Sequence, residues 1–430
     1  MQKQWIIQGA FAALLTLTLT ACSGNNPDTQ EGQSAGVIDQ AAIERLNATL
    51  GGFVESGHLA GASVLIFEGG QEVYFNTFGM ADREAGVPMS RDTLVQIFSM
   101  TKPITGVAML TLYEQGKLDL DDPVSKFVPE LADVRVYAGT DEHGEMILEA
   151  PHREITIRDL TRHTAGFANS PDLPGVGPIL AAEAPGAQEN TLSEMAEKMA
   201  RVPLYFQPGE RWSYGPEVDV LALVVERVSG QPFDAYVREK ILVPLKMRET
   251  SYFVSEEDRS RFAAVYERNG NGKLNRMPDA LGQRLATQRW ALTPGGYGLT
   301  SSLDDYMRFA RMLVNEGELD GARILQPDTV RTMATNHLPD DVTDRSWLPH
   351  KGQVGFGVNV AVRLNPPASA EENNGTVGEF FWDGAASTLF WVDPENDLAA
   401  ILFVQLLPFD EIGLHKAFRD AVYGPFSTEH

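Results

Sequence analysis

The sequence has few cysteines and few basic residues, and each shortage excludes a class of protein. Cys22 is the single cysteine among 430 residues, so no internal disulfide can form and no Cys/His metal cluster is available. We expect neither a metal nor a cofactor. Lysine and arginine total 35 against 59 acidic residues, and the resulting net charge of −24 argues against binding to nucleic acid or to anionic lipid.

Long apolar runs are also missing beyond the N-terminus, and no internal repeat is evident. Past the first two dozen residues, no apolar run is long enough to span a bilayer. A chain of 430 residues with a hydrophobic fraction of 43% suits one large enzyme unit or two sub-domains around a cleft.

Residues 1–21 are predicted to be an export signal. One lysine precedes a mostly apolar stretch, and small residues then lead to Cys22. This end resembles the lipobox of bacterial lipoproteins, in which the chain is cut before the cysteine and the cysteine is acylated. An ordinary secretory signal is the alternative. Ser23 after the cysteine favours the outer membrane by the same resemblance, so we expect a lipid-anchored protein that faces the periplasm and touches the membrane only through its anchor.

Apolar periodicity predicts strands near both ends of the mature chain and helices between them. A polar tether at 22–36 precedes the folded part at 37–425. This order favours an α+β fold in which one antiparallel sheet is assembled from both ends and a helical sub-domain is inserted. The sheet sub-domain is expected at about 37–100 and 290–425, with a mainly helical sub-domain at about 101–289. The predicted C-terminal strands are 357–362, 388–392 and 398–405, followed by a helix at 412–422.

Ser99 and Lys102 are the first candidates for chemistry. Residues three apart share one face of a helix, so the hydroxyl and the amine would meet at close range. Such an amine can take the serine proton when burial or neighbouring charge disfavours its ammonium form. Pro103 is tolerated only in a first turn, which predicts a helix start near Ser99 and free N–H groups there for an oxyanion. Ser-x-x-Lys also arises by chance in a chain of this length, so the pair needs support from elsewhere.

Two further segments could complete such a site. Tyr214 lies in a glycine- and proline-rich approach to a predicted helix, where its hydroxyl could relay a proton, although a core tyrosine is the simpler alternative. Small residues after Trp382 would let a strand edge approach an acyl group closely. The backbone N–H of Ala385 is then a candidate second oxyanion donor beside that of Ser99, and a plain turn is the alternative.

Five ordered motifs together resemble the class C β-lactamase-like serine hydrolases, which include the family VIII carboxylesterases and related acyl transferases. The resemblance runs from about Ile38 to Val422. It implies a β-lactamase/penicillin-binding-protein-like fold, with Ser99 as nucleophile, Lys102 as base and Tyr214 as catalytic tyrosine. Trp382, Asp383 and Gly384 occupy the family's third motif, so Trp382 and Gly384 are expected to line the substrate site with Ala385. The matching segments are Ser99 to Lys102, Leu160 to Gly166, Pro208 to Tyr214, Pro294 to Leu299 and Trp382 to Gly384.

The departures from the family pattern concern the substrate. Penicillin-active members carry Tyr-x-Asn and Lys-Thr-Gly, but here Pro216 replaces the asparagine and Trp382 replaces the lysine. Both changes remove polar groups that position a β-lactam. Esterases of the family resemble this sequence better at the third motif, although Asp383 departs even from them and would disfavour anionic substrates if it pointed inward.

The leading hypothesis is a serine hydrolase that cleaves a small-molecule ester or amide through an acyl-enzyme on Ser99. Lys102 and Tyr214 would share the acid and base roles, because coupled groups titrate as a pair. The first alternative is β-lactamase or D-alanyl peptidase activity, with Arg211 or Arg363 as the cation for a substrate carboxylate. The second is a non-catalytic envelope protein that binds a peptide or lipid. The oligomeric state stays open.

Overall fold

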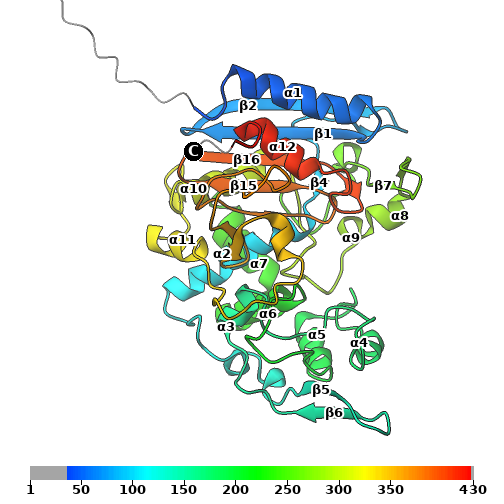
Figure 1. Ribbon diagram of the computed structural model, residues 1–430, viewed down its shortest axis with the longest axis vertical. Coiled ribbons are helices and arrows are strands. Elements are labelled where there is room, and N and C mark those ends of the chain that lie inside the picture. The colour runs from blue at the N-terminus through cyan, green and yellow to red at the C-terminus, as the bar shows by residue number, and fades with distance from the viewer. Residues whose placement is uncertain (1–35, 428–430) are drawn as a thin grey trace, which may run out of the picture. The chain divides into compact units, whose positions relative to one another are not determined.

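A computed structural model describes residues 36–427, and an eight-stranded antiparallel sheet lies at its centre (Figure 1). The predicted signal peptide and Cys22 lie outside the described residues. The strand order is β12-β13-β14-β15-β16-β1-β2-β3. These strands are Gly61–Glu68 (β1), Gln71–Asp82 (β2), Val87–Pro88 (β3), Val354–Phe356 (β12), Ala361–Arg363 (β13), Phe380–Asp383 (β14), Leu389–Asp393 (β15) and Leu398–Phe403 (β16).

The two ends of the chain meet in the middle of this sheet. β1 pairs antiparallel with β16, and Val64 lies opposite Leu402. Every residue of β16 is buried, as are the first six of β1, so side chains on both faces of the sheet are covered. The predicted α+β class, with an antiparallel sheet built from both ends, is confirmed.

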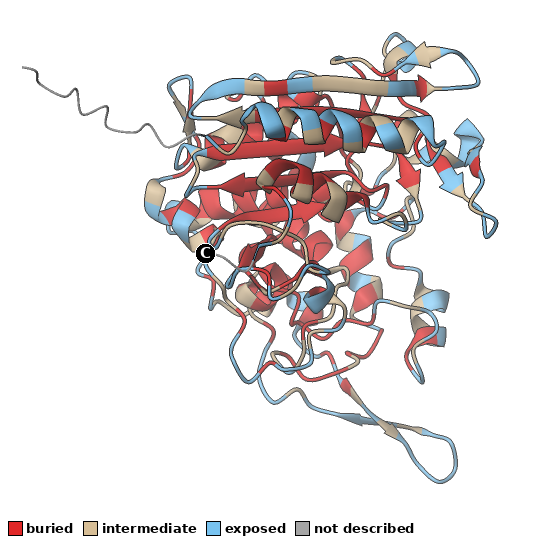
Figure 2. Cartoon of the chain, turned by 45° about the horizontal axis from the view of Figure 1, so that its top comes forward, coloured by how far each residue is buried: buried red, intermediate tan, exposed pale blue. Residues whose placement is uncertain are grey.

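Helices cover the sheet on both faces (Figures 1 and 2). α1 and α12 lie side by side and α1 contacts β1 and β2, while α10 packs against β1, β15 and β16. No helix among residues 36–427 has the length and apolar character that a membrane span requires. The helices are Gln40–Glu55 (α1), Thr101–Glu114 (α2), Ile157–Thr161 (α3), Gly177–Glu183 (α4), Leu192–Met199 (α5), Glu217–Ser229 (α6), Phe233–Val237 (α7), Asp279–Gly282 (α8), Arg284–Thr287 (α9), Leu303–Val314 (α10), Pro327–Met333 (α11) and Leu414–Tyr423 (α12).

The segment between the two parts of the sheet is less helical than the sequence predicts. Thr156 and Thr191 form capping boxes at the starts of α3 and α5. Short hairpins were missed because their strands are mostly exposed and lack a clear apolar alternation. The small strands outside the main sheet are Val95–Gln96 (β4), Val136–Thr140 (β5), Met146–Glu149 (β6), Tyr266–Arg268 (β7), Leu274–Arg276 (β8), Thr300–Ser301 (β9), Glu318–Leu319 (β10), Ala322–Arg323 (β11) and Leu406–Leu407 (β17). The division into sub-domains at about 101 and 289 stays a prediction.

The predicted strand at 357–362 is wrong, because most of it forms the turn between β12 and β13. The Gly357 N–H donates to the Val360 carbonyl at 2.8 Å, and Asn359 adopts a left-handed φ of 59°. The side-chain amide of Asn359 donates to the backbone carbonyl of Lys102 at 3.1 Å. The turn therefore supports the first turn of α2.

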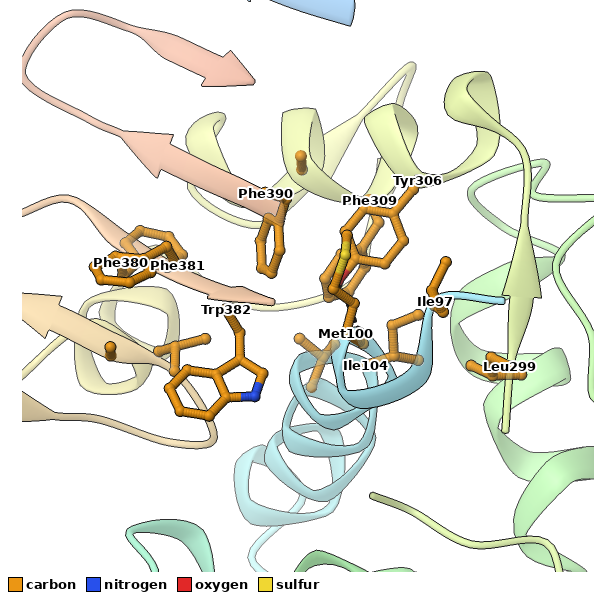
Figure 3. Close-up of a cluster of buried hydrophobic side chains, with 14 of the residues drawn as sticks. Ile97, Met100, Ile104, Leu299, Tyr306, Phe309, Phe380, Phe381, Trp382 and Phe390 are labelled. Atoms are coloured by element: carbon orange, nitrogen blue, oxygen red, sulfur yellow. Dashed lines mark hydrogen bonds between the residues drawn. The ribbon is translucent and has the colours of Figure 1, made fainter. Parts of the chain in front are cut away.

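An aromatic and aliphatic cluster joins the sheet to the start of α2 (Figure 3). Phe390 of β15 and Tyr306 of α10 lie on either side of Met100, and the Trp382 ring of β14 lies beside α2. The buried Tyr306 hydroxyl donates to the Met100 carbonyl at 2.8 Å. The core thus fixes the turn that carries Ser99.

Candidate active site

Ser99 lies on a 3-10 turn, Phe98–Met100, between β4 and α2. Phe98 has a left-handed φ of 44°, a conformation that costs a non-glycine residue roughly 1–2 kcal/mol. Buried neighbours hold the turn in place, since the Ile97 N–H donates to the Leu299 carbonyl at 3.0 Å and Met100 is fully buried. α2 begins at Thr101, two residues after Ser99, so the predicted helix start near Ser99 is confirmed.

Lys102 reaches back from the first turn of α2 toward Ser99. Its ammonium nitrogen lies 3.4 Å from the Ser99 hydroxyl oxygen and donates to the Gly296 carbonyl at 2.8 Å. The side chain is 5% exposed, so few waters compete for these contacts. The same nitrogen lies 4.5 Å from the centre of the Tyr214 ring. The structure therefore brings the three predicted catalytic side chains together.

Tyr214 is held by partners on both its backbone and its side chain. The Asn169 amide donates to its carbonyl at 2.8 Å, and the indole N–H of Trp382 donates to its hydroxyl at 3.3 Å. Trp347 packs edge-on against the ring with centroids 5.3 Å apart. Hydrogen bonds and aromatic neighbours thus hold the Tyr214 side chain in place.

Asp219 is a charged neighbour that the sequence analysis missed. It lies on α6 five residues after Tyr214 and accepts the Gly296 N–H at 2.7 Å. Burial raises the pKa of its carboxyl to about 6, and the nearby Lys102 charge opposes that rise. Gly296 therefore connects Asp219, through its N–H, to Lys102, through its carbonyl. An acid within the otherwise apolar stretch from Val218 to Val225 was the available signal.

A second buried pair lies behind Tyr214. His163 Nδ1 is 2.9 Å from Glu217 Oε2, and both side chains are fully buried. Burial lowers the pKa of His163, so its neutral form, donating to the carboxylate, predominates at neutral pH. The imidazole packs on Tyr214 with ring centroids 4.7 Å apart. This buried pair therefore supports the Tyr214 ring.

Ser99, Lys102 and Tyr214 open into one groove of about 740 Å³, which we call the catalytic groove. This volume is within the usual range of small-molecule sites, about 300–1,000 Å³. Among the described residues that line it, Lys102 and Asp219 alone carry charge, and they lie close together. Its lining residues are Phe98, Ser99, Lys102, Ala168, Asn169, Pro171, Leu180, Ala181, Ala184, Pro185, Gly186, Ala187, Tyr214, Gly215, Pro216, Asp219, Gly296, Tyr297 and Ala385.

The end of β14 approaches the Ser99 turn closely enough to exclude any side chain at Gly384. A Cβ there would lie 2.5 Å from the Ile97 carbonyl oxygen and 2.2 Å from the Thr388 hydroxyl. Ala385 follows and lines the catalytic groove, where its backbone N–H meets no acceptor among the described residues. Trp382 is fully buried and contacts Tyr214, so direct contact of Trp382 or Gly384 with substrate stays a prediction.

Asp383 points away from the catalytic groove. Its carboxylate accepts a hydrogen bond from Lys351, and both side chains are less than a tenth exposed. Of the two cations considered for a substrate carboxylate, Arg363 is fully buried against Glu379 at 2.8 Å, and Arg211 pairs with Glu210 at 3.2 Å. Neither arginine lines the groove.

Comparison with known proteins agrees with this geometry. Residues 46–423 match a protein family described as beta-lactamase. The chain belongs to the β-lactamase family. This result confirms the predicted family and fold, and the enzyme relatives described next support its assignment as a serine hydrolase.

This β-lactamase-family chain is similar to a mycobacterial protein, to an esterase and to a hydrolase of known structure. Protein Rv1367c of Mycobacterium tuberculosis is 36% identical over 360 residues, which are 82% of this chain and 88% of that protein. Esterase EstB of Burkholderia gladioli is 30% identical over 410 residues, or 90% of this chain and 96% of EstB. The solved structure of EstCE1, a hydrolase with promiscuous acyltransferase activity, superposes with a TM-score of 0.74 at 25% identity, over 90% of this chain and 99% of EstCE1.

Proposed function

We propose that the chain cleaves carboxylic esters through a covalent acyl-enzyme on Ser99. One observation carries the proposal: Lys102 Nζ lies 3.4 Å from Ser99 Oγ and 4.5 Å from the Tyr214 ring centre, in a groove with little other charge. The esterase and hydrolase relatives support the same reaction class.

The proposed reaction has two halves. Ser99 Oγ attacks the ester carbonyl while the Lys102–Tyr214 pair takes its proton, and the backbone N–H groups of Ser99 and Ala385 hold the oxyanion. The pair then returns the proton to the leaving alcohol as the C–O bond breaks. In the second half a water repeats the attack on the acyl-enzyme and releases the acid.

The groove favours neutral esters over penicillin-like substrates. A substrate carboxylate would need a free cation, but Lys102 is engaged by Gly296 and lies close to Asp219. Leaving a substrate carboxylate unpaired in the groove costs affinity, which makes β-lactamase or D-alanyl peptidase activity the weaker alternative.

Replacing Ser99 with alanine tests the proposal. Turnover of p-nitrophenyl butyrate should fall by at least roughly a thousandfold, because the acyl carrier is lost. Ser125→Ala, which removes a hydroxyl outside the groove, is the matched control. Undiminished turnover in Ser99→Ala would refute the mechanism, and a folded wild-type protein whose Ser99 takes up no fluorophosphonate label would favour the non-catalytic alternative.

We also propose that Cys22 anchors the enzyme to the cell envelope with its groove in the periplasm. The support is the N-terminal sequence alone. Full-length protein expressed with labelled palmitate should carry the label and sediment with membranes, whereas Cys22→Ala should do neither. Equal labelling of the two proteins would contradict the anchor.

A further inference from the structure

A second, smaller cavity adjoins the catalytic groove at Tyr297. This side cavity has a volume of about 80 Å³. Its walls combine apolar and aromatic side chains, Tyr252, Phe253, Trp290 and Leu292 among them, with the charged Asp234 and Arg289. Tyr297 lines both the side cavity and the catalytic groove. Its side chain therefore lies at the boundary between the two spaces.

A hydrogen bond fixes Tyr297 at this boundary. The Gln188 side-chain amide donates to the Tyr297 hydroxyl at 2.9 Å. The Gln188 backbone carbonyl also accepts the Leu292 N–H at 3.1 Å. The segment that follows α4 is therefore attached to the loop before Tyr297. Ala187 lines the catalytic groove, whereas Gln188 lines the side cavity. The Tyr297–Gln188 pair thus forms the wall between them.

The backbone on either side of Tyr297 has little freedom to move. The Gly296 N–H and carbonyl are bonded to Asp219 and Lys102. At Gly298, with φ of 106°, a Cβ would lie 3.0 Å from the Tyr252 ring. The ring of Tyr297 is consequently held by its backbone as well as by its hydroxyl.

Tyr297 is poorly suited to acid–base chemistry. Burial and the Asp219 charge raise its pKa to about 12, so the phenol stays protonated at neutral pH. Its hydroxyl is occupied by Gln188, while Lys102 contacts Ser99 and Gly296. These contacts favour a role for Tyr297 as a boundary between the two spaces, not as a proton donor or acceptor.

We propose that the Tyr297–Gln188 pair limits the length of the apolar acyl chain that the enzyme accepts. With the wall in place, a chain entering from Ser99 ends in the catalytic groove. Without the ring, the side cavity joins the groove and its aromatic walls can cover additional methylenes. The inference rests on the proposed esterase function and assigns Tyr297 as a specificity-determining residue for neutral acyl esters.

Chain-length preference in Tyr297→Ala tests this role. The measured quantity is kcat/KM for p-nitrophenyl octanoate divided by kcat/KM for p-nitrophenyl butyrate. Methylene discrimination in a hydrophobic pocket is worth about 10- to 200-fold, so the ratio should rise at least roughly tenfold. Tyr297→Phe keeps the ring and removes only the hydroxyl, and its ratio should stay within about threefold of wild type, the size of one weak hydrogen bond.

Each other outcome has a defined meaning. If the alanine variant does not fold, Tyr297→Leu serves as a second variant that replaces the ring with a smaller side chain. Turnover of both esters with an unchanged ratio in a folded variant overturns the inference and leaves the esterase function intact. Loss of both activities while Ser99 still takes a fluorophosphonate label also overturns it, because Tyr297 would then act in catalysis. No turnover even by wild-type protein indicates failure of the esterase proposal itself.

Discussion

Trp382 and Asp383 are adjacent residues at the end of β14, but their surroundings differ strongly in charge. Trp382 is buried and contacts Tyr214, which lines the catalytic groove, where little charge is present. Asp383 faces a second cavity of about 300 Å³, where it is paired with Lys351 and where Arg419 is also fully buried. Successive side chains of a strand alternate between faces, so one short strand serves two environments.

This comparison shows where the enzyme uses charge. In the penicillin-active proteins that the sequence resembles, a lysine occupies the position of Trp382. Here a lysine is present near this position, but it comes from residue 351 and its charge is neutralised behind the strand. The groove side therefore carries the proposed reacting groups, and the Lys351–Asp383 ion pair lies outside the groove.

The largest expected effect is on the groove side, in Tyr214→Phe. Removing the hydroxyl takes away a proton carrier, so kcat/KM for a neutral ester should fall about 10²- to 10⁴-fold. Stability should also fall, by about 1–3 kcal/mol, because the indole N–H of the buried Trp382 loses its acceptor in the described part of the chain. Ester kinetics and thermal unfolding measure the two effects, with Trp382→Phe as the milder companion. Wild-type kinetics in Tyr214→Phe would remove the tyrosine from the mechanism.

The second largest effect is expected on stability, in Asp383→Asn, which lies outside the catalytic groove. This variant leaves the buried Lys351 ammonium unpaired, and breaking a buried pair costs about 3–5 kcal/mol of unfolding free energy. Urea denaturation should show this loss while kcat of the remaining folded enzyme stays near wild type. The double variant Lys351→Met with Asp383→Leu removes both charges and should recover most of the stability. Equal stability of wild type and Asp383→Asn would contradict a structural role for the pair.

The smallest effect is expected at Asp219, whose charge lies on the groove side. Its pKa is raised by burial from 3.8 to about 6, so the folded protein binds this proton more tightly than the unfolded chain. That contribution to stability is complete below about pH 4 and is lost as the pH rises through about 6. Asp219→Asn removes the titration, so relative to wild type it should gain roughly 2–3 kcal/mol between pH 4 and pH 7.

Urea denaturation of the wild type and of Asp219→Asn at several pH values measures the difference. Asp305→Asn is a useful control, because that pKa is also raised by burial but the residue lies outside the catalytic groove. A pH-independent difference between wild type and Asp219→Asn would show that the carboxyl does not titrate in this range.

Local sequence predicted the parts of the site that depend on local geometry. Ser99 and Lys102 are one turn apart, so their contact follows from the start of one helix. The helix entrance made Tyr214 a candidate, but the family resemblance was needed to place it in the site, because its approach to Lys102 depends on how α6 packs on α2. Lys351 and Asp383 are 32 residues apart, and their pairing depends on tertiary structure alone.

The same distinction applies to the fold. Strands with buried, β-branched residues, such as β1 and β16, were predicted because their composition reflects burial. The turn at 357–360 was mistaken for a strand because its valines are buried by contacts with α2 and α11, not by sheet pairing. The β5–β6 hairpin does contain apolar residues, such as Ile147 and Leu148, but they are exposed and do not alternate with polar ones, so the pattern does not predict a strand.

The pairing of β1 with β16 bears on how the molecule is made. Val64 and its partner Leu402 are separated by most of the chain, so the central sheet cannot close until the ribosome has released nearly the whole polypeptide. The turn that bears the nucleophile is braced by that sheet and by α10, so it too forms late. A newly synthesised chain therefore cannot complete the central sheet, or fix the turn that bears Ser99, until its last strands have emerged.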